Sequence, residues 1–236
     1  MPAVRFKILR FNPVNDPLPH FETYEVDATP TERILDCLNR IRWKQDSSLA
    51  YRMSCGHGIC GSDGMVINGK PCLACQKLVG DFDYSREITI EPLQFFKVIK
   101  DLIVDMDPFF KGFRSIHPEE KAWIRPVQSK ERLQSIEKRA KFDDAIKCIN
   151  CACCTSSCPV NLKEDNLYIG PAAVLRAFRY IFDSRVGNAD ARMHIIDQTH
   201  GVWGCKTYYR CTVVCPKGIK VTKAILETKE KIRAIH

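Results

Sequence analysis

Two runs near the C-terminal end of the chain repeat one cysteine spacing. They read Cys148-x2-Cys151-x2-Cys154-x3-Cys158-Pro159 and Cys205-x2-Tyr208-x2-Cys211-x3-Cys215-Pro216. In such a run, three closely spaced thiolates bind one iron–sulfur cluster, while the fourth cysteine, the one before proline, serves the other cluster. The pattern therefore predicts two neighbouring clusters that exchange their fourth ligands.

This exchange leaves the two clusters with unequal ligand sets, because Tyr208 stands where the second run lacks a cysteine. Three thiolates favour a [3Fe-4S] centre, and cluster type and net charge help to set the reduction potential. The prediction is a [4Fe-4S] cluster on Cys148, Cys151, Cys154 and Cys215 and a [3Fe-4S] cluster on Cys158, Cys205 and Cys211. Two unlike clusters suit stepwise electron transfer.

A third candidate site lies in a glycine-rich loop earlier in the chain. Cys55, Cys60, Asp63 and Cys75 follow the plant-type [2Fe-2S] spacing, with aspartate in the third place. A carboxylate is a harder ligand than a thiolate, so the replacement should change the potential without preventing assembly. Cys72 is the alternative fourth ligand because it lies three residues before Cys75.

The remaining cysteines, Cys37 and Cys153, fit no cluster spacing and are not expected to be ligands. Zinc is the alternative metal for the N-terminal loop. Zinc sites usually pair their ligands in short Cys-x2-4-Cys knuckles, which this loop and the distant Cys75 fit less well. The sequence therefore favours iron–sulfur clusters.

Composition narrows the class of protein. The chain has 236 residues, 45% of them hydrophobic, which is enough for one large or two ordinary packed domains. The chain has thirteen cysteines, and most of them stand at metal-ligand spacings, which favours a reducing compartment over a disulfide framework. No apolar stretch approaches the roughly 20 residues of a membrane-spanning helix, so we expect a membrane role only through a partner.

The chain has a net charge of +8, but its basic residues are interspersed with acidic residues. No nucleic-acid binding is therefore expected.

The first 105 residues predict a small α+β domain. Alternation over residues 4–8 and 21–26 indicates a β-hairpin. Thr29-Pro30-Thr31-Glu32 predicts a capping box that opens a helix running through Ile41. Asn68-Gly69 predicts a second hairpin after the strand 65–67, and residues 88–93 read as a final strand. The arrangement resembles the plant-type ferredoxin (β-grasp) fold.

The rest of the chain predicts a different architecture. Residues 106–128, rich in aromatic residues and proline, read as an interdomain connection. Residues 129–236 have mainly helical patterns, including a helix opened by Gly170-Pro171. The predicted fold class is thus α+β, with a plant-type ferredoxin domain followed by an all-α, two-cluster ferredoxin-like domain.

Motifs beyond the cysteine spacings stand in segments 54–65, 67–69, 73–75, 148–154, 169–172, 201–203 and 214–217. Together these segments resemble one protein family, the iron–sulfur subunit of succinate dehydrogenase and fumarate reductase. The resemblance implies an electron-transfer subunit without substrate chemistry of its own. Electrons would pass between a FAD-containing flavoprotein subunit and a quinone through [2Fe-2S], [4Fe-4S] and [3Fe-4S] clusters. Membrane-anchor subunits, with or without haem b, would hold the chain at the cytoplasmic face of the inner membrane.

The resemblance also bears on the quinone. Lys163 and Lys206 stand where members of the ubiquinone type commonly have tryptophan and histidine, and the quinone-site lysine of fumarate reductases would fall on Lys229. Pro159 and Trp203 are the other quinone-proximal candidates. These features favour menaquinone. The alternative for the three lysines is a solvated cationic surface.

Two other functions fit the same cysteine runs. One is the iron–sulfur subunit of another flavin-dependent oxidoreductase, although the N-terminal cluster loop is not expected in many of those. The other is a free-standing ferredoxin that carries electrons by diffusion, which the length of the chain disfavours. The direction of the reaction, succinate oxidation or fumarate reduction, is left open.

Overall fold

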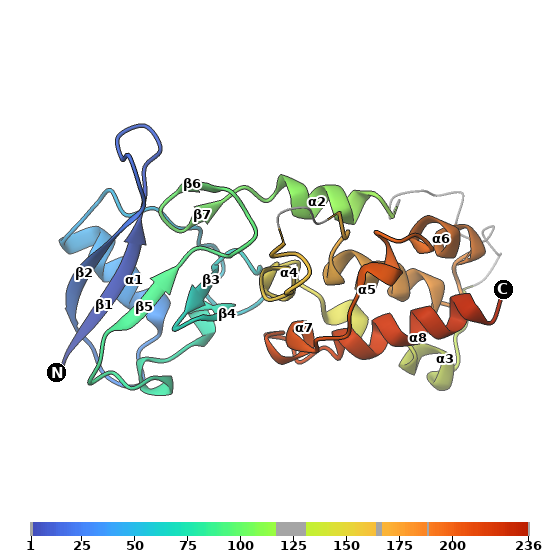
Figure 1. The fold of residues 1–236 in the computed structure, drawn as a ribbon. Helices are drawn as coiled ribbons and strands as arrows, with labels where there is room; N and C mark the ends of the chain where they lie inside the picture. Colours follow the sequence, from blue (N-terminus) through green and yellow to red (C-terminus); the bar gives the residue numbers. More distant parts are fainter. Residues whose placement is uncertain (1, 117–130, 164–166, 188, 236) are drawn as a thin grey trace. The chain divides into compact units, whose positions relative to one another are not determined.

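The computed structural model describes residues 2–116, 131–163, 167–187 and 189–235 (Figure 1). The chain divides into two compact units. The first ends at Met106 and also contains Ile149–Ser157, whereas the second comprises Asp107–Cys148 and Cys158–His236. The sequence predicted domains over residues 1–105 and 129–236, joined by residues 106–128. That prediction assigned residues 149–157 to the second domain, whereas they belong to the first unit. Most of the predicted connection, residues 117–128, lies outside the described residues.

A five-stranded sheet forms the core of the first unit, in the order β2-β1-β5-β3-β4 (Figure 1). β1 pairs antiparallel with β2 and parallel with β5. Alternate β1 side chains, Val4, Phe6 and Ile8, are fully buried, as the alternating pattern predicts. Both predicted hairpins are confirmed. The strands are β1 (Ala3–Arg10), β2 (His20–Asp27), β3 (Gly64–Ile67), β4 (Lys70–Leu73) and β5 (Ile88–Glu91).

The helix of this unit, α1 (Ile34–Lys44), contacts β2 and buries Ile34, Leu38 and Ile41. Its predicted start at the capping box was wrong. The Glu32 carboxylate does accept the Thr29 N–H at 2.6 Å, but this bond closes a turn before the helix. The backbone next to the helix is held extended because Ile34 donates its N–H to the Lys77 carbonyl, 2.8 Å away. A long-range pairing thus overrides the local signal.

A small second sheet, β6 (Val98–Lys100) and β7 (Ile103–Val104), was not predicted. Its turn residue Asp101 is buried in a left-handed conformation, with φ of 46°. The Asp101 carboxylate accepts the N–H groups of Phe11 and Ala50, at 3.0 and 2.8 Å, and faces the Arg10 guanidinium at 3.1 Å. Contacts with distant residues therefore hold this hairpin. Two 3-10 turns, η1 (Ala74–Gln76) and η2 (Val79–Asp81), lie between β4 and β5.

The second unit is helical, with α5 at its centre in contact with α2, α6 and α8. Gly170, with φ of 92°, precedes Pro171 at the first position of α5, so the predicted helix opening is confirmed. None of the helices in the described parts of the chain has the length and apolarity to cross a membrane. The helices are α2 (Asp107–Arg114), α3 (Ile136–Ala140), α5 (Pro171–Ile181), α6 (Ala189–Ile196), α7 (Arg210–Val213) and α8 (Val221–Arg233), with 3-10 turns η4 (Ala145–Lys147) and η5 (Val202–Gly204).

Candidate iron–sulfur cluster sites

The N-terminal cysteine loop directs backbone N–H groups at a sulfur atom. His57 and Cys60 each donate an N–H to Cys55 Sγ, at 3.3 Å. These bonds, that of His57 first, lower the pKa of the Cys55 thiol to about 7. Gly56 makes this turn possible because its φ of 67° is a conformation that other residues rarely adopt. A thiolate stabilised by N–H donors is the form that binds iron.

Asp63 lies at the same site and is 3% exposed. Its Oδ2 accepts the N–H of Cys75 at 2.6 Å. Its Oδ1 is buried without a hydrogen-bond partner among the described residues. Burial, and after it the neighbouring Asp63 carboxylate, raises the pKa of the Cys75 thiol to about 12. A buried carboxylate beside a thiol requires a compensating positive group, and iron would supply it.

Cys72, the alternative ligand, lies in β4 opposite Met65 of β3. Burial raises the pKa of its thiol to about 11. No hydrogen bond joins Cys72 to the cluster loop among the described residues, whereas Asp63 is bonded to the Cys75 backbone. The geometry therefore supports Asp63 as the fourth ligand. Cys37 and Cys153 are both fully buried.

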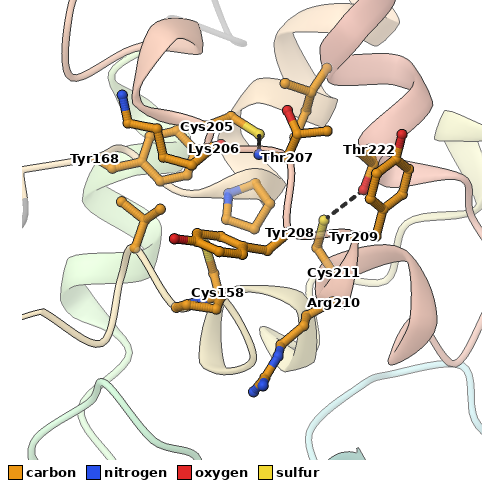
Figure 2. A pocket seen from close by; sticks show the side chains of 14 residues that line it. Cys158, Tyr168, Cys205, Lys206, Thr207, Tyr208, Tyr209, Arg210, Cys211 and Thr222 are labelled. Carbon is orange, nitrogen blue, oxygen red and sulfur yellow. Dashed lines mark hydrogen bonds between the residues drawn. The ribbon is translucent and has the colours of Figure 1, made fainter.

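The three cysteines predicted for the [3Fe-4S] centre line one pocket in the second unit. Figure 2 shows Cys158, Cys205 and Cys211 around it, with the ring of Tyr208 among them. Thr207 donates its N–H to Cys205 Sγ at 3.4 Å, and Cys211 Sγ lies 3.3 Å from the Thr222 hydroxyl. Burial raises the pKa of the Cys158 and Cys211 thiols. A pocket lined by three buried or half-buried thiols fits a cluster with three protein ligands.

The two cysteine runs share an unusual backbone. The second and fourth residues after the first cysteine adopt the left-handed conformation in both runs. These residues are Asn150, Ala152, Thr207 and Tyr209, with φ between 55° and 62°. A short helix starts directly after each, namely α4 (Cys153–Ser156) and α7. Tyr208 therefore occupies the structural place of Cys151, which was visible in the sequence only as a spacing.

The four cysteines predicted for the [4Fe-4S] cluster come from different parts of the chain. Cys151 and Cys154 belong to the segment Ile149–Ser157 of the first unit, whereas Cys148 and Cys215 belong to the second unit. A hydrogen bond to the neighbouring Cys153 side chain lowers the pKa of the Cys151 thiol. The assignment of these four cysteines to one cluster stays a prediction.

Lys229 and Trp203 meet next to the three-cysteine pocket. Lys229 is 9% exposed, and its ammonium group donates a hydrogen bond to the Cys205 carbonyl at 2.8 Å. Its Nζ also lies 5.7 Å from the centre of the Trp203 ring. Burial lowers the pKa of Lys229. A solvated surface position therefore does not describe Lys229, and its bond to the cysteine loop could not be predicted from the sequence.

The other quinone-proximal candidates divide into two groups. Pro159 and Lys206 line the pocket with the three cysteines. Lys163 is exposed and is not among the lining residues. Within the described residues, no three His, Cys, Asp or Glu side chains converge as a single metal ion requires.

Comparison with known proteins identifies the family. A model of the 2Fe-2S iron-sulfur cluster binding domain matches residues 5–111, and one of the 4Fe-4S dicluster domain matches residues 144–219. The chain is 38% identical over 232 residues to the succinate dehydrogenase iron-sulfur subunit of Coxiella burnetii, covering 96% of each protein. It belongs to the succinate dehydrogenase iron–sulfur subunit family.

Further relatives agree with this membership. The succinate dehydrogenase [ubiquinone] iron-sulfur subunit of Candida glabrata mitochondria is also 38% identical, over 96% of this chain and 90% of that protein. The solved Mycobacterium smegmatis Sdh1 complex in the apo form contains a chain with a TM-score of 0.88 and 25% identity, covering 99% and 96% of the two chains. A hypothetical protein from Helicobacter pylori shares the fold alone, with a TM-score of 0.59 and 16% identity, over 97% of this chain and 39% of that one.

These findings confirm several predictions from the sequence. The α+β fold class with its two ferredoxin-like domains is confirmed, as is the electron-transfer role in an oxidoreductase. The cofactors of this succinate dehydrogenase subunit are iron–sulfur clusters, [2Fe-2S] on the N-terminal domain and a pair on the helical domain. Family membership excludes zinc as the metal of the N-terminal loop, and it excludes both alternative functions, the subunit of another flavin-dependent oxidoreductase and the free-standing ferredoxin.

The fourth ligand of the [2Fe-2S] cluster can be tested with paired substitutions. We expect Asp63→Leu to lose the cluster, because it removes the ligand oxygen and leaves the Cys75 N–H unpaired. Asp63→Cys should keep the cluster with changed g-values, since it completes a set of four thiolates. Electron paramagnetic resonance of the dithionite-reduced complex measures both.

Cys72→Ser is the matched control, because it removes the competing thiol and leaves Asp63 in place. It should keep the wild-type spectrum. A lost or altered [2Fe-2S] signal in Cys72→Ser, together with an unchanged signal in Asp63→Leu, would assign the ligand to Cys72 instead.

Proposed function

We propose that this subunit conducts electrons between a flavoprotein and a quinone through three clusters held on eleven side chains. The assignment is [2Fe-2S] on Cys55, Cys60, Asp63 and Cys75, [4Fe-4S] on Cys148, Cys151, Cys154 and Cys215, and [3Fe-4S] on Cys158, Cys205 and Cys211. The observation that carries it is the pocket around the last three cysteines, where Tyr208 takes the place of a fourth thiolate.

The chemistry of the residues fits this assignment. Backbone N–H groups point at Cys55 and Cys205, as they do toward thiolates that carry clusters. Tyr208 is 56% exposed, and its phenol is a poor ligand compared with a thiolate. Bound clusters would supply one-electron redox chemistry. The protein would hold them in order, limit access of water and set their potentials through charge and hydrogen bonds.

The partners follow from family membership. A succinate dehydrogenase iron–sulfur subunit works beside a flavoprotein that carries FAD and subunits that anchor the complex to a membrane. The M. smegmatis relative was solved as part of a complex. We place this chain at the cytoplasmic face of the inner membrane, held by its anchor, whether or not that anchor binds haem b.

The quinone is proposed to bind next to the pocket lined by Cys158, Cys205 and Cys211. Pro159 and Lys206 line this pocket, and Lys229 is bonded to the Cys205 loop beside Trp203. The ammonium group of Lys229 places a positive charge where a quinone would be reduced, and this charge favours the reduced, more negative form of both cluster and quinone. With lysine at 163 and 206, menaquinone is the proposed electron acceptor or donor.

Tyr208→Cys tests the three-iron assignment. A cysteine at this position would have the backbone of Cys151 and so provide a fourth thiolate. We expect the spectrum of the oxidised complex to lose its three-iron signal and a new signal to appear on reduction at lower potential. Redox titration followed by electron paramagnetic resonance measures the change.

Tyr209→Cys is the matched control, because Tyr209 is equally exposed, at 55%, and occupies the neighbouring position. It should leave the oxidised-state signal in place. An unchanged signal in fully iron-loaded Tyr208→Cys, or the same conversion in both variants, would contradict the assignment.

Lys229→Met tests the quinone end. Because it removes the buried charge beside Cys205, we expect a several-fold lower quinone-coupled rate and a lower potential of the three-iron centre. Rates from succinate to a dye that accepts electrons before the quinone should be retained. Assays with a naphthoquinone and a benzoquinone should show that the wild-type complex prefers the naphthoquinone.

Lys223→Met on the same helix is the control, because Lys223 is 68% exposed and forms a surface ion pair with Glu227. Its quinone-coupled rate should match the wild type. If Lys229→Met and the wild type have equal quinone-coupled rates and equal cluster potentials, Lys229 has no role at the quinone site. A wild-type preference for the benzoquinone would contradict the proposal of menaquinone.

A further inference from the structure

The loop that holds two predicted [4Fe-4S] ligands packs with the first unit. Segment Ile149–Ser157 belongs to that unit, and its helix α4 contacts β4. Ala152 is 1% exposed and Cys153 is fully buried. The segment is therefore seated on the domain of the first cluster rather than exposed to solvent.

The segment approaches the sheet most closely at Gly64, the first residue of β3. A Cβ added there would lie 2.9 Å from the Cys151 carbonyl oxygen, 3.4 Å from the Leu93 side chain and 3.7 Å from Cys153 Sγ. Gly64 is not among the residues with positive φ. Its backbone conformation is therefore open to alanine, and only the closeness of the Cys151 loop requires glycine at this position.

Gly61 repeats the contact on the other side of Asp63. A Cβ there would lie 2.8 Å from the Ile149 carbonyl and 2.9 Å from Cys151 Cβ. The two glycines thus bring the backbone on both sides of Asp63 against the Cys151 loop. Asp63 itself is bonded to the Cys75 backbone within the first cluster site. One short stretch of backbone, residues 61–64, touches the ligand loops of two clusters.

This contact has a consequence for electron transfer. The rate of tunnelling between two centres falls steeply as their distance grows, so a displacement of one ligand loop slows the transfer between them. We propose that Gly64 is a positioning residue that sets the spacing between the first and second clusters by letting the Cys151 loop approach β3. The proposal rests on the ligand assignment given above.

Gly64→Ala in the assembled complex tests the proposal. With both clusters reduced, the second cluster speeds the spin relaxation of the first, and this enhancement decreases steeply with distance. We expect a several-fold smaller enhancement in Gly64→Ala, measured by pulsed electron paramagnetic resonance. Alkylation of Cys153 by a maleimide, followed by mass spectrometry, should become several-fold faster as the loop moves away.

Gly80→Ala is the matched control. Gly80 lies in the same unit without positive φ, and its added Cβ would lie 3.0 Å from the Pro30 carbonyl, far in sequence from the Cys151 loop. It should keep both the relaxation enhancement and the protection of Cys153. This control separates a local displacement from a general effect of a crowded alanine.

The outcomes are distinct. A wild-type enhancement in Gly64→Ala with both clusters present overturns the proposal, and so does an equal loss in Gly80→Ala. If Gly64→Ala loses the second cluster, the alkylation of Cys153 decides. Alkylation as slow as in wild type also overturns the proposal, whereas fast alkylation found only in this variant supports it. A wrong ligand assignment is recognised separately, because Asp63→Leu would then keep the [2Fe-2S] signal, or Cys151→Ser would keep the four-iron signal.

Discussion

The structure depends on one requirement, that backbone N–H groups face the sulfur atoms of the cluster ligands. A chain can meet it only by turning sharply around each thiolate. Glycines make the turn in the N-terminal loop, whereas the two C-terminal loops use Asn150, Ala152, Thr207 and Tyr209 in the left-handed conformation. Such a residue costs about 1–3 kcal/mol and persists where its surroundings enforce it. The surroundings of the cysteine loops are therefore part of the electron-transfer machinery.

The two C-terminal loops have the same backbone but different supports. The first is seated on β3 and β4 of the sheet domain through Gly61 and Gly64. The second is held by α8, because Thr222 contacts Cys211 and Thr212 while Lys229 binds the Cys205 carbonyl. A repeated sequence thus occupies two unlike environments. If the loops bind the clusters as proposed, different surroundings and the missing thiolate at Tyr208 would give the two clusters different potentials.

Features set by neighbouring residues could be predicted from the sequence. Asn68-Gly69 specifies its hairpin, Gly170-Pro171 opens α5, and the cysteine spacings identify the three candidate sites. Features set by distant residues could not. The start of α1 is moved by a bond from Ile34 to Lys77, and the β6–β7 hairpin depends on Asp101 contacts some fifty to ninety residues away. The seating of segment Ile149–Ser157 on the first unit is long-range as well.

The exchange of fourth ligands between the two cysteine runs can be measured by redox-titrated electron paramagnetic resonance of Cys158→Ser and Cys215→Ser complexes. We expect Cys158→Ser to lose the oxidised-state three-iron signal and keep the four-iron signal, and Cys215→Ser to do the reverse. Loss of the four-iron signal in Cys158→Ser, with the three-iron signal intact, would instead show that each run binds its own cluster.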